Sequence, residues 1–268
     1  MSESHGAPCI VVGIDGSPSA VDAALWAVDY AVGDGVPLRL VYVIEPSEDS
    51  STPDPQDRAR RLATAELAVR YAVTAVESAD RPVDIEIAIM HGSPVRVLLE
   101  AARTATMVCV GARGLRHATR GRIGSTAAAV SAGAHCPVAI VRAHRPHSAR
   151  ERAVVAEYHD VSAGTSVVRR ALAEAHRRHA AVRLIAPPRV CGEIATRGSR
   201  QLSQWSHDYP DLDISPVSCT DTLDYLRHHS GTIQLLVIGR NRTAGVTEVV
   251  GPPGNAAMRD TDCSILVV

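Results

Sequence analysis

The chain has 268 residues, of which 46% are hydrophobic and 21% are charged, and its formal net charge is −1 at pH 7. This composition is typical of a globular protein with a buried core. The near-zero charge argues against a general nucleic-acid-binding or membrane-surface protein, because both need a strong basic excess. No apolar run is long enough to span a bilayer, and residues 1–8 lack a signal-peptide pattern, so we expect a cytoplasmic protein.

Apolar strands and amphipathic helices alternate along the first half of the chain. The expected strands are Cys9–Ile14, Leu38–Ile44, Val83–Met90, Val108–Gly111 and Pro137–Val141. Alternation of this kind predicts a parallel sheet covered by helices on both faces, which is a doubly wound, Rossmann-like α/β domain. Ligands in such sheets bind beyond the carboxyl ends of the strands.

Cap and proline signals place the helices between these strands. Ser17-Pro18 and Ser93-Pro94 each announce a helix start, because serine caps a helix and proline is favoured at its first position. A polar loop, Pro46–Pro55, precedes a long helix that is marked by the apolar residues Leu62, Leu67, Val69, Val73 and Val76. The Ala-Val-rich run after Ser125-Thr126 predicts the fourth helix.

The same pattern begins again after a linker at Arg142–Arg152. Further strands are expected at Ala153–Glu157, Val182–Ala186, Leu212–Val217, Leu235–Gly239 and Ser264–Val268, with helices around Val167–Ala175, Arg197–Trp205 and Leu223–Leu226. Cys136-Pro-Val-Ala-Ile-Val returns as Cys263-Ser-Ile-Leu-Val-Val, which indicates an internal duplication. We therefore expect two tandem domains, at residues 1–145 and 152–268.

A glycine-rich loop joins the strand ending at Gly111 to the helix after Gly124, with Gly114 between them. Helix N-termini bind anions through unpaired N–H groups and the helix dipole, and glycine lets a phosphate approach the backbone. Ser125 or Thr126 is expected to cap the helix. The loop also carries Arg113, Arg116, His117, Arg120 and Arg122. The pattern predicts a polyphosphate cradle, although many such loops bind nothing and carry arginine only for solubility.

A P-loop is excluded, because it needs lysine before the Ser or Thr and this chain contains no lysine. The second half has lost the cradle: Arg242 stands where Gly114 would be, and Pro252, which lacks an N–H, replaces Ser125. Tyr158, or by a shifted register His159 or Asp160, takes the place of Asp15. We expect one competent site and one structural copy.

Metal sites are not expected. The six cysteines have no Cys-x-x-Cys spacing, and His176 and His179 are flanked by arginines on what reads as a solvated helix face.

These motifs, taken in order, resemble a tandem universal stress protein. Nucleotide-binding members of that family carry Gly-x2-Gly-x9-Gly-Ser/Thr, which this sequence matches at Gly111, Gly114, Gly124 and Ser125. The segments Val11–Ser17, Val41–Ile44 and His91–Pro94 also resemble family positions.

The resemblance implies that the first domain binds an adenine nucleotide such as ATP. Asp15 and Val43 would face the adenine and ribose, and Gly111 would lie near the ribose and first phosphate. Gly114, Gly124, Ser125 and Thr126 would hold the polyphosphate, with Mg²⁺ bridging its oxygens. From the residues alone, Asp15 reads equally well as a turn-closing carboxylate and Val43 as core.

The resemblance further implies a stress-associated regulatory protein with at most slow hydrolysis, in which nucleotide binding orders residues 112–123 for an unknown protein partner. One alternative is an ATP hydrolase or phosphotransferase that uses His117 or an arginine at the γ-phosphate. Another is a scaffold that binds no nucleotide. By analogy with the family's homodimer, the closing strands Val138–Val141 and Ile265–Val268 would pair within the chain, and a homodimer of whole chains stays open.

Overall fold

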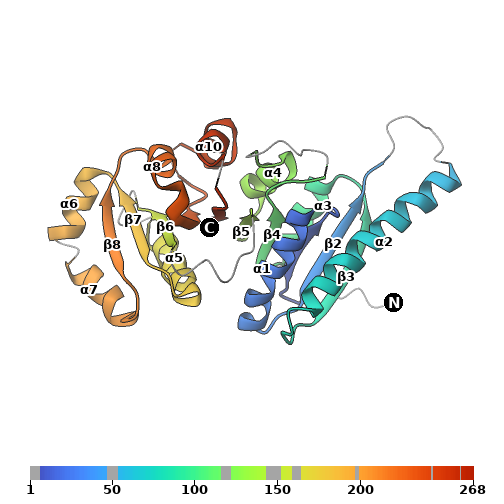
Figure 1. Cartoon of the computed structure of the whole chain (residues 1–268), viewed down its shortest axis with the longest axis horizontal. Helices are drawn as coiled ribbons and strands as arrows, with labels where there is room; N and C mark the ends of the chain where they lie inside the picture. The colour runs from blue at the N-terminus through green and yellow to red at the C-terminus, as the bar shows by residue number, and fades with distance from the viewer. Residues whose placement is uncertain are drawn as a thin grey trace. The chain divides into compact units, whose positions relative to one another are not determined.

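The computed structural model describes residues 7–46, 54–115, 122–142, 152–158, 164–196, 199–242, 244–259 and 261–268. The chain divides into two compact units, and the change from one to the other falls at residues 144 and 145 (Figure 1). Each unit is an α/β domain built on a parallel sheet, as the alternation of strands and helices predicts.

The N-terminal unit holds five parallel strands in the order β3-β2-β1-β4-β5. They are β1 (Ile10–Ile14), β2 (Leu38–Ile44), β3 (Ile85–His91), β4 (Met107–Gly111) and β5 (Val138–Val141). Helices α1 (Pro18–Asp34) and α2 (Pro55–Glu77) pack on each other and on the sheet, in front of it in Figure 1. Helices α3 (Pro94–Ala101) and α4 (Ser125–Gly133) pack together and complete the doubly wound fold.

Helix α1 begins as the cap-and-proline signal predicts. The Ser17 hydroxyl accepts the N–H of Ala20 at 3.2 Å, and Pro18 occupies the first turn. The helix ends at Gly35, whose φ of 65° is favourable for glycine. Its buried face consists largely of alanine, which lets the helix lie close to the sheet.

Helix α2 confirms the predicted long helix, but not all of the apolar residues that mark it are buried. The buried residues are Ala65, Val69, Ala72 and Val76, whereas Leu67 is 68% exposed and Leu62 is 43% exposed. Small residues at the contact let the helix approach the sheet closely. This contact fixes the rotation of the helix about its axis, and in that orientation both leucines point away from the sheet. The helix also begins earlier, at Pro55, with Asp54 as its N-cap.

The C-terminal unit repeats the topology, with parallel strands in the order β8-β7-β6-β9-β10. They are β6 (Ala153–Glu157), β7 (Val182–Ala186), β8 (Ile214–Ser218), β9 (Ile233–Ile238) and β10 (Ser264–Val267). Its helices are α5 (Gly164–Arg178), α6 (Pro188–Thr196), α7 (Ser199–Asp208), α8 (Thr222–His229), α9 (Val246–Val250) and α10 (Pro252–Ala257). A 3₁₀ turn, η1 (Ser230–Thr232), follows α8.

Helix α7 lies where the shortened helix is expected, at Arg197–Trp205, and an additional helix, α6, precedes it. Helix α6 begins at Pro188, and the Pro187-Pro188 pair is the start signal that the prediction missed. The pairing of β5 with β10 stays a prediction. Among the described helices, none combines the length and apolar character that crossing a bilayer requires.

Candidate functional site

A cavity of about 670 Å³ opens at the carboxyl ends of β1, β2 and β4 in the N-terminal unit. Six of the seven residues predicted for the nucleotide site line it, and they are Asp15, Val43, Gly111, Gly114, Ser125 and Thr126. The seventh, Gly124, directly precedes Ser125 as the N-cap of α4. The structure thus brings the predicted residues together around one cavity, at the edge of the sheet where such ligands bind.

The first turn of α4 presents free backbone donors to this cavity. Gly124 is the N-cap, and the first intrahelical bond runs from the Ala128 N–H to the Gly124 carbonyl. The N–H groups of Ser125, Thr126 and Ala127 therefore have no backbone partner within the described residues, and all three residues line the cavity. The expectation that Ser125 or Thr126 caps the helix is wrong, because both lie inside it. Their N–H groups, together with the helix dipole, can bind an anion.

The three motif glycines have different reasons to be glycine. A Cβ on Gly111 would lie 2.6 Å from the backbone carbon of Ser19, so close packing of α1 on β4 requires glycine there whether or not a ligand binds. A Cβ on Gly114 would lie 2.8 Å from Oδ2 of Asp15. Among the described residues, which exclude 116–121, a Cβ on Gly124 would meet nothing closer than 3.8 Å, and its φ of −67° suits any residue. In this described part of the fold, nothing demands glycine at Gly124 as the backbone of Ser19 does at Gly111.

Asp15 serves as a structural carboxylate within the cavity wall. Its Oδ1 accepts the N–H of Ser17 at 2.9 Å and its Oδ2 accepts the N–H of Leu115 at 3.2 Å. The interpretation of Asp15 as a turn-closing residue is therefore correct, and the carboxylate also ties the start of the glycine loop to the end of β1.

The arginines of the glycine loop are only partly described. Arg113 lines the cavity, and its N–H donates to the Ser19 hydroxyl at 3.4 Å. Arg122 is exposed. Arg116, His117 and Arg120 lie outside the described residues, so their predicted roles stay predictions.

Helix α2 contributes cavity residues that the sequence reasoning missed. Arg60, Arg61 and Thr64 line the cavity beside the end of β2. Arg61 is held by two contacts, from Nε to Asp57 at 2.6 Å and from Nη1 to the Glu45 carbonyl at 2.9 Å. Hydrogen bonds from Arg60 and Arg61 lower the pKa of Asp57 below its usual range. The spacing of Asp57, Arg60 and Arg61 at i, i+3 and i+4 is the signal that could have found them.

The C-terminal unit fills the equivalent crevice with its own side chains. The Ala112 N–H donates to the Val141 carbonyl at 2.7 Å, and in the second unit the Arg240 N–H donates to the Val268 carbonyl at 2.7 Å. These equivalent bonds align Arg240 with Ala112. Two residues further along the chain, Arg242 therefore occupies the position of Gly114. In the same way, the Ile10 N–H donates to the Pro37 carbonyl and the Val154 N–H donates to the Ala181 carbonyl, so Val154 aligns with Ile10. This register places Glu157 at the position of Gly13 and Tyr158 at that of Ile14. Tyr158 is therefore not the counterpart of Asp15, and the alternatives His159 and Asp160 lie outside the described residues.

Arg242 and Glu157 form a buried ion pair in that crevice. Arg242 donates to both carboxylate oxygens of Glu157, at 2.9 and 2.7 Å, and to Glu248 at 2.7 Å. The Thr222 hydroxyl donates to Glu157 at 2.6 Å. The side chains of Arg242 and Glu157 are only 5% and 3% exposed. Burial opposes the charge of Arg242, but the hydrogen bonds and charges of the two carboxylates outweigh it and raise the pKa of Arg242 above its usual value.

Metal ligands do not gather in groups of three or more anywhere in the part of the chain that the structure describes. His176 instead contacts the ring of Tyr209, with ring centroids 5.7 Å apart.

Strand order, helices on both faces and a cavity at the carboxyl strand ends define a Rossmann-like α/β protein. Residues 9–142 match the universal stress protein family, and the chain belongs to that family. A universal stress protein of Mycobacterium tuberculosis is 43% identical over 276 residues, which cover 100% of this chain and 98% of the relative. Another from the same strain is 38% identical, covering 97% of this chain and 95% of the relative. A universal stress protein structure from Archaeoglobus fulgidus shares the fold, with a TM-score of 0.71 at 15% identity over 97% of both chains.

Proposed function

We propose that the N-terminal unit binds an adenine nucleotide, with its polyphosphate against the first turn of α4. One observation carries this proposal: Ser125, Thr126 and Ala127 line the cavity, and their N–H groups have no backbone partners in the described chain. Unpaired N–H groups at a helix N-terminus favour phosphate oxygens over neutral ligands. The absence of any steric need for glycine at Gly124 among the described residues supports a ligand there.

The base would lie toward Asp15, which follows β1, and Val43 of β2, because both line the same cavity. Mg²⁺ would be held on the phosphate oxygens, because both oxygens of Asp15 already accept backbone N–H groups. We infer that the equivalent crevice of the C-terminal unit binds no nucleotide and has a structural role, since Arg242 and Glu157 occupy it.

We infer a regulatory role, acting on an unknown protein partner, rather than rapid catalysis. Hydrolysis needs a group that positions or deprotonates water at the γ-phosphate. Two carboxylates belong to the described lining, Asp15 and Glu45. Asp15 is engaged as above, and Glu45 follows β2, which β1 separates from β4, so it lies about 10 Å to the side of the glycine loop.

The second unit supplies the sharpest test of the binding proposal. Its α10 begins with Pro252 after Gly251, where α4 begins with Ser125 after Gly124. Ser125→Pro therefore copies the degenerate sequence, removes one N–H and keeps a residue that helix starts favour. We expect calorimetric titration with Mg-ATP to show binding to wild type and at least about tenfold weaker binding to Ser125→Pro.

Ser125→Ala is the matched control, because it removes the hydroxyl and keeps the N–H. We expect it to retain most of the affinity. Equal ATP affinity in wild type and Ser125→Pro would overturn the proposed site, and absence of any ATP binding would favour the scaffold alternative.

Phosphate release by wild type and His117→Ala separates regulation from catalysis. Slow release, equal in both proteins, is expected; fast release that is lost in His117→Ala would establish a hydrolase.

A further inference from the structure

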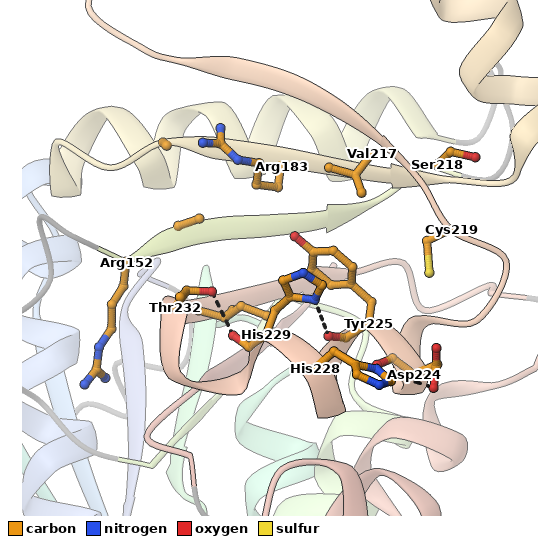
Figure 2. A pocket seen from close by; sticks show the side chains of 13 residues that line it. Arg152, Arg183, Val217, Ser218, Cys219, Asp224, Tyr225, His228, His229 and Thr232 are labelled. Carbon is orange, nitrogen blue, oxygen red and sulfur yellow. Dashed lines mark hydrogen bonds and ion pairs between the residues drawn. The ribbon is translucent and has the colours of Figure 1, made fainter.

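The C-terminal unit contains a second cavity, of about 570 Å³, in a different place from the crevice that Arg242 fills. It lies under α8, beside the amino ends of β6, β7 and β9 and against β8, and its volume is in the range of small-molecule sites. Figure 2 shows Arg183 and Val217 on the strands, with Tyr225 and His229 facing them from α8.

Tyr225 offers this cavity a hydrogen-bond donor. Tyr225 is only 9% exposed as a residue, but its hydroxyl is not among the fully buried, unpartnered side-chain atoms of the described residues. In Figure 2 the hydroxyl points from α8 toward the strands. Burial raises the pKa of Tyr225, so the phenol is protonated at neutral pH and can donate. Because Tyr225 lines the cavity, its hydroxyl can donate to an acceptor on a ligand that enters it.

The cavity wall is cationic. Arg152 and Arg183 line it, against the single carboxylate of Asp224. Asp224 already lies 3.6 Å from His228 and 3.8 Å from Arg227. Arg183 donates from Nη2 to the Asp213 carboxylate at 2.8 Å, and from Nη1 to the carbonyls of Val182 and Asp213 at 3.2 and 3.4 Å. The carboxylate is 62% exposed, so solvent screens the ion pair strongly, and the neutral carbonyls do not cancel the charge of the guanidinium. The wall therefore keeps a preference for anions.

A stacked pair of rings forms the other part of the wall. The rings of Tyr225 and His229 lie 4.1 Å apart at an interplanar angle of 17°. His229 Nδ1 lies 2.9 Å from the Tyr225 carbonyl, which can only accept, so Nδ1 carries a proton and the ring is fixed in place. Ala153, Val217 and Ile233 add aliphatic surface.

We propose that this cavity binds a small aromatic carboxylate, whose anionic group is bound by the Tyr225 hydroxyl and Arg183 and whose ring packs on the apolar wall. A flat ring matches the stacked side chains, and a carboxylate is the acceptor that a phenol and a guanidinium share. The site is independent of nucleotide binding in the N-terminal unit.

The test uses the full chain with saturating Mg-ATP present, so that the cavity of the N-terminal unit is not available to the probe. Benzoate is titrated by ligand-observed NMR into wild type, Tyr225→Phe and Arg183→Met. Tyr225→Phe keeps the ring and removes only the hydroxyl. Tyr71→Phe is the matched control, because Tyr71 is 64% exposed on α2.

We expect benzoate to bind wild type and Tyr71→Phe equally, and to bind Tyr225→Phe and Arg183→Met about tenfold more weakly. Benzamide, the neutral analogue, is expected to bind wild type more weakly than benzoate. No benzoate binding to wild type, equal binding to Tyr225→Phe, or equal binding of benzamide would each overturn the proposal. If Arg183→Met fails to fold, Tyr225→Phe decides alone, since its packing is preserved.

Discussion

Asp15 and Leu115 are joined across the mouth of the cavity by a hydrogen bond of 3.2 Å from the Leu115 N–H to Oδ2 of Asp15. The other carboxylate oxygen closes the turn at Ser17. One side chain thus sets both the end of β1 and the course of the loop that follows β4.

Asp15→Ala should lower the free energy of unfolding by about 1–3 kcal/mol, because two backbone donors lose their acceptor. Asp15→Asn, which retains one carbonyl oxygen, should lose less. Urea denaturation measures both values. Equal stability of Asp15→Ala and wild type would show that the two contacts contribute nothing.

Alanine substitutions at Gly111 and Gly124 should have opposite effects. Gly111→Ala should destabilise the protein by more than about 1 kcal/mol, because its Cβ would collide with the backbone of α1. Gly124→Ala should fold with unchanged or slightly higher stability, since alanine suits its backbone angles, and should weaken ATP binding. Thermal unfolding and calorimetry test the two effects separately. Unimpaired ATP binding by Gly124→Ala would count against a phosphate at that position.

Arg61 is expected to affect the base end of the site. Because Asp57 and the Glu45 carbonyl fix its guanidinium, Arg61→Ala should weaken ATP binding by about 3- to 30-fold through lost contact with the base. Inorganic triphosphate, which has no base, should bind both proteins alike. Arg70→Ala is the control, since Arg70 is an exposed arginine of the same helix and does not belong to the described lining of the cavity. A loss shared by both ligands would indicate a general charge effect.

The hydrogen bond between Arg61 and Asp57 should persist unchanged across the neutral pH range. The pKa of Asp57 is lowered by Arg60 and Arg61, so its stabilising contacts are fully present above the unfolded pKa of about 3.9. They are lost only as the pH falls through the lower folded value. The ATP affinity ratio between wild type and Asp57→Asn should therefore stay constant from pH 8 to 5. A ratio that changes across this range would mean that Asp57 titrates near neutrality.

Removing Arg242 should strongly destabilise the C-terminal unit. Arg242→Met removes the cation that neutralises the buried Glu157 carboxylate, and breaking a buried ion pair in this way typically costs about 3–5 kcal/mol. Replacing both residues by methionine should recover part of this loss, because the buried charge is then gone. Denaturation monitored at Trp205, which contacts Tyr158 in the same unit, measures the effect. ATP affinity should be unchanged, and a large change would mean that the two units are coupled.

Much of the fold could be predicted because local signals and packing agree. Continuous apolar runs predict the strands, and the Ser17-Pro18 signal predicts the start of α1. The inner face of α2 could not be predicted, since alanines rather than leucines make its contact with the sheet. The cap of α4 was displaced by one residue because glycine, like serine, is favoured at that position.

The site was predictable only where spacing carries the signal. The glycine spacing and the strand ends located the cavity and its anion-binding end. Arg60 and Arg61 could not be placed from the apolar residues of α2, because those residues mark the helix but do not show which of its charged side chains lie beside the end of β2. The partner of Arg242 was missed because Glu157 ends an apolar strand, and only the strand register shows that it faces the crevice.

The buried Arg242–Glu157 pair makes the carboxyl half resemble a receptor that carries its ligand as part of its own chain. Added nucleotide should therefore not stabilise the carboxyl half. When thermal unfolding is measured at rising nucleotide concentrations, we expect the unfolding temperature of the amino half to rise and that of the carboxyl half to stay constant. The constant unfolding temperature of the carboxyl half would then be an internal reference, and the shift measured relative to it would report nucleotide occupancy of the amino half.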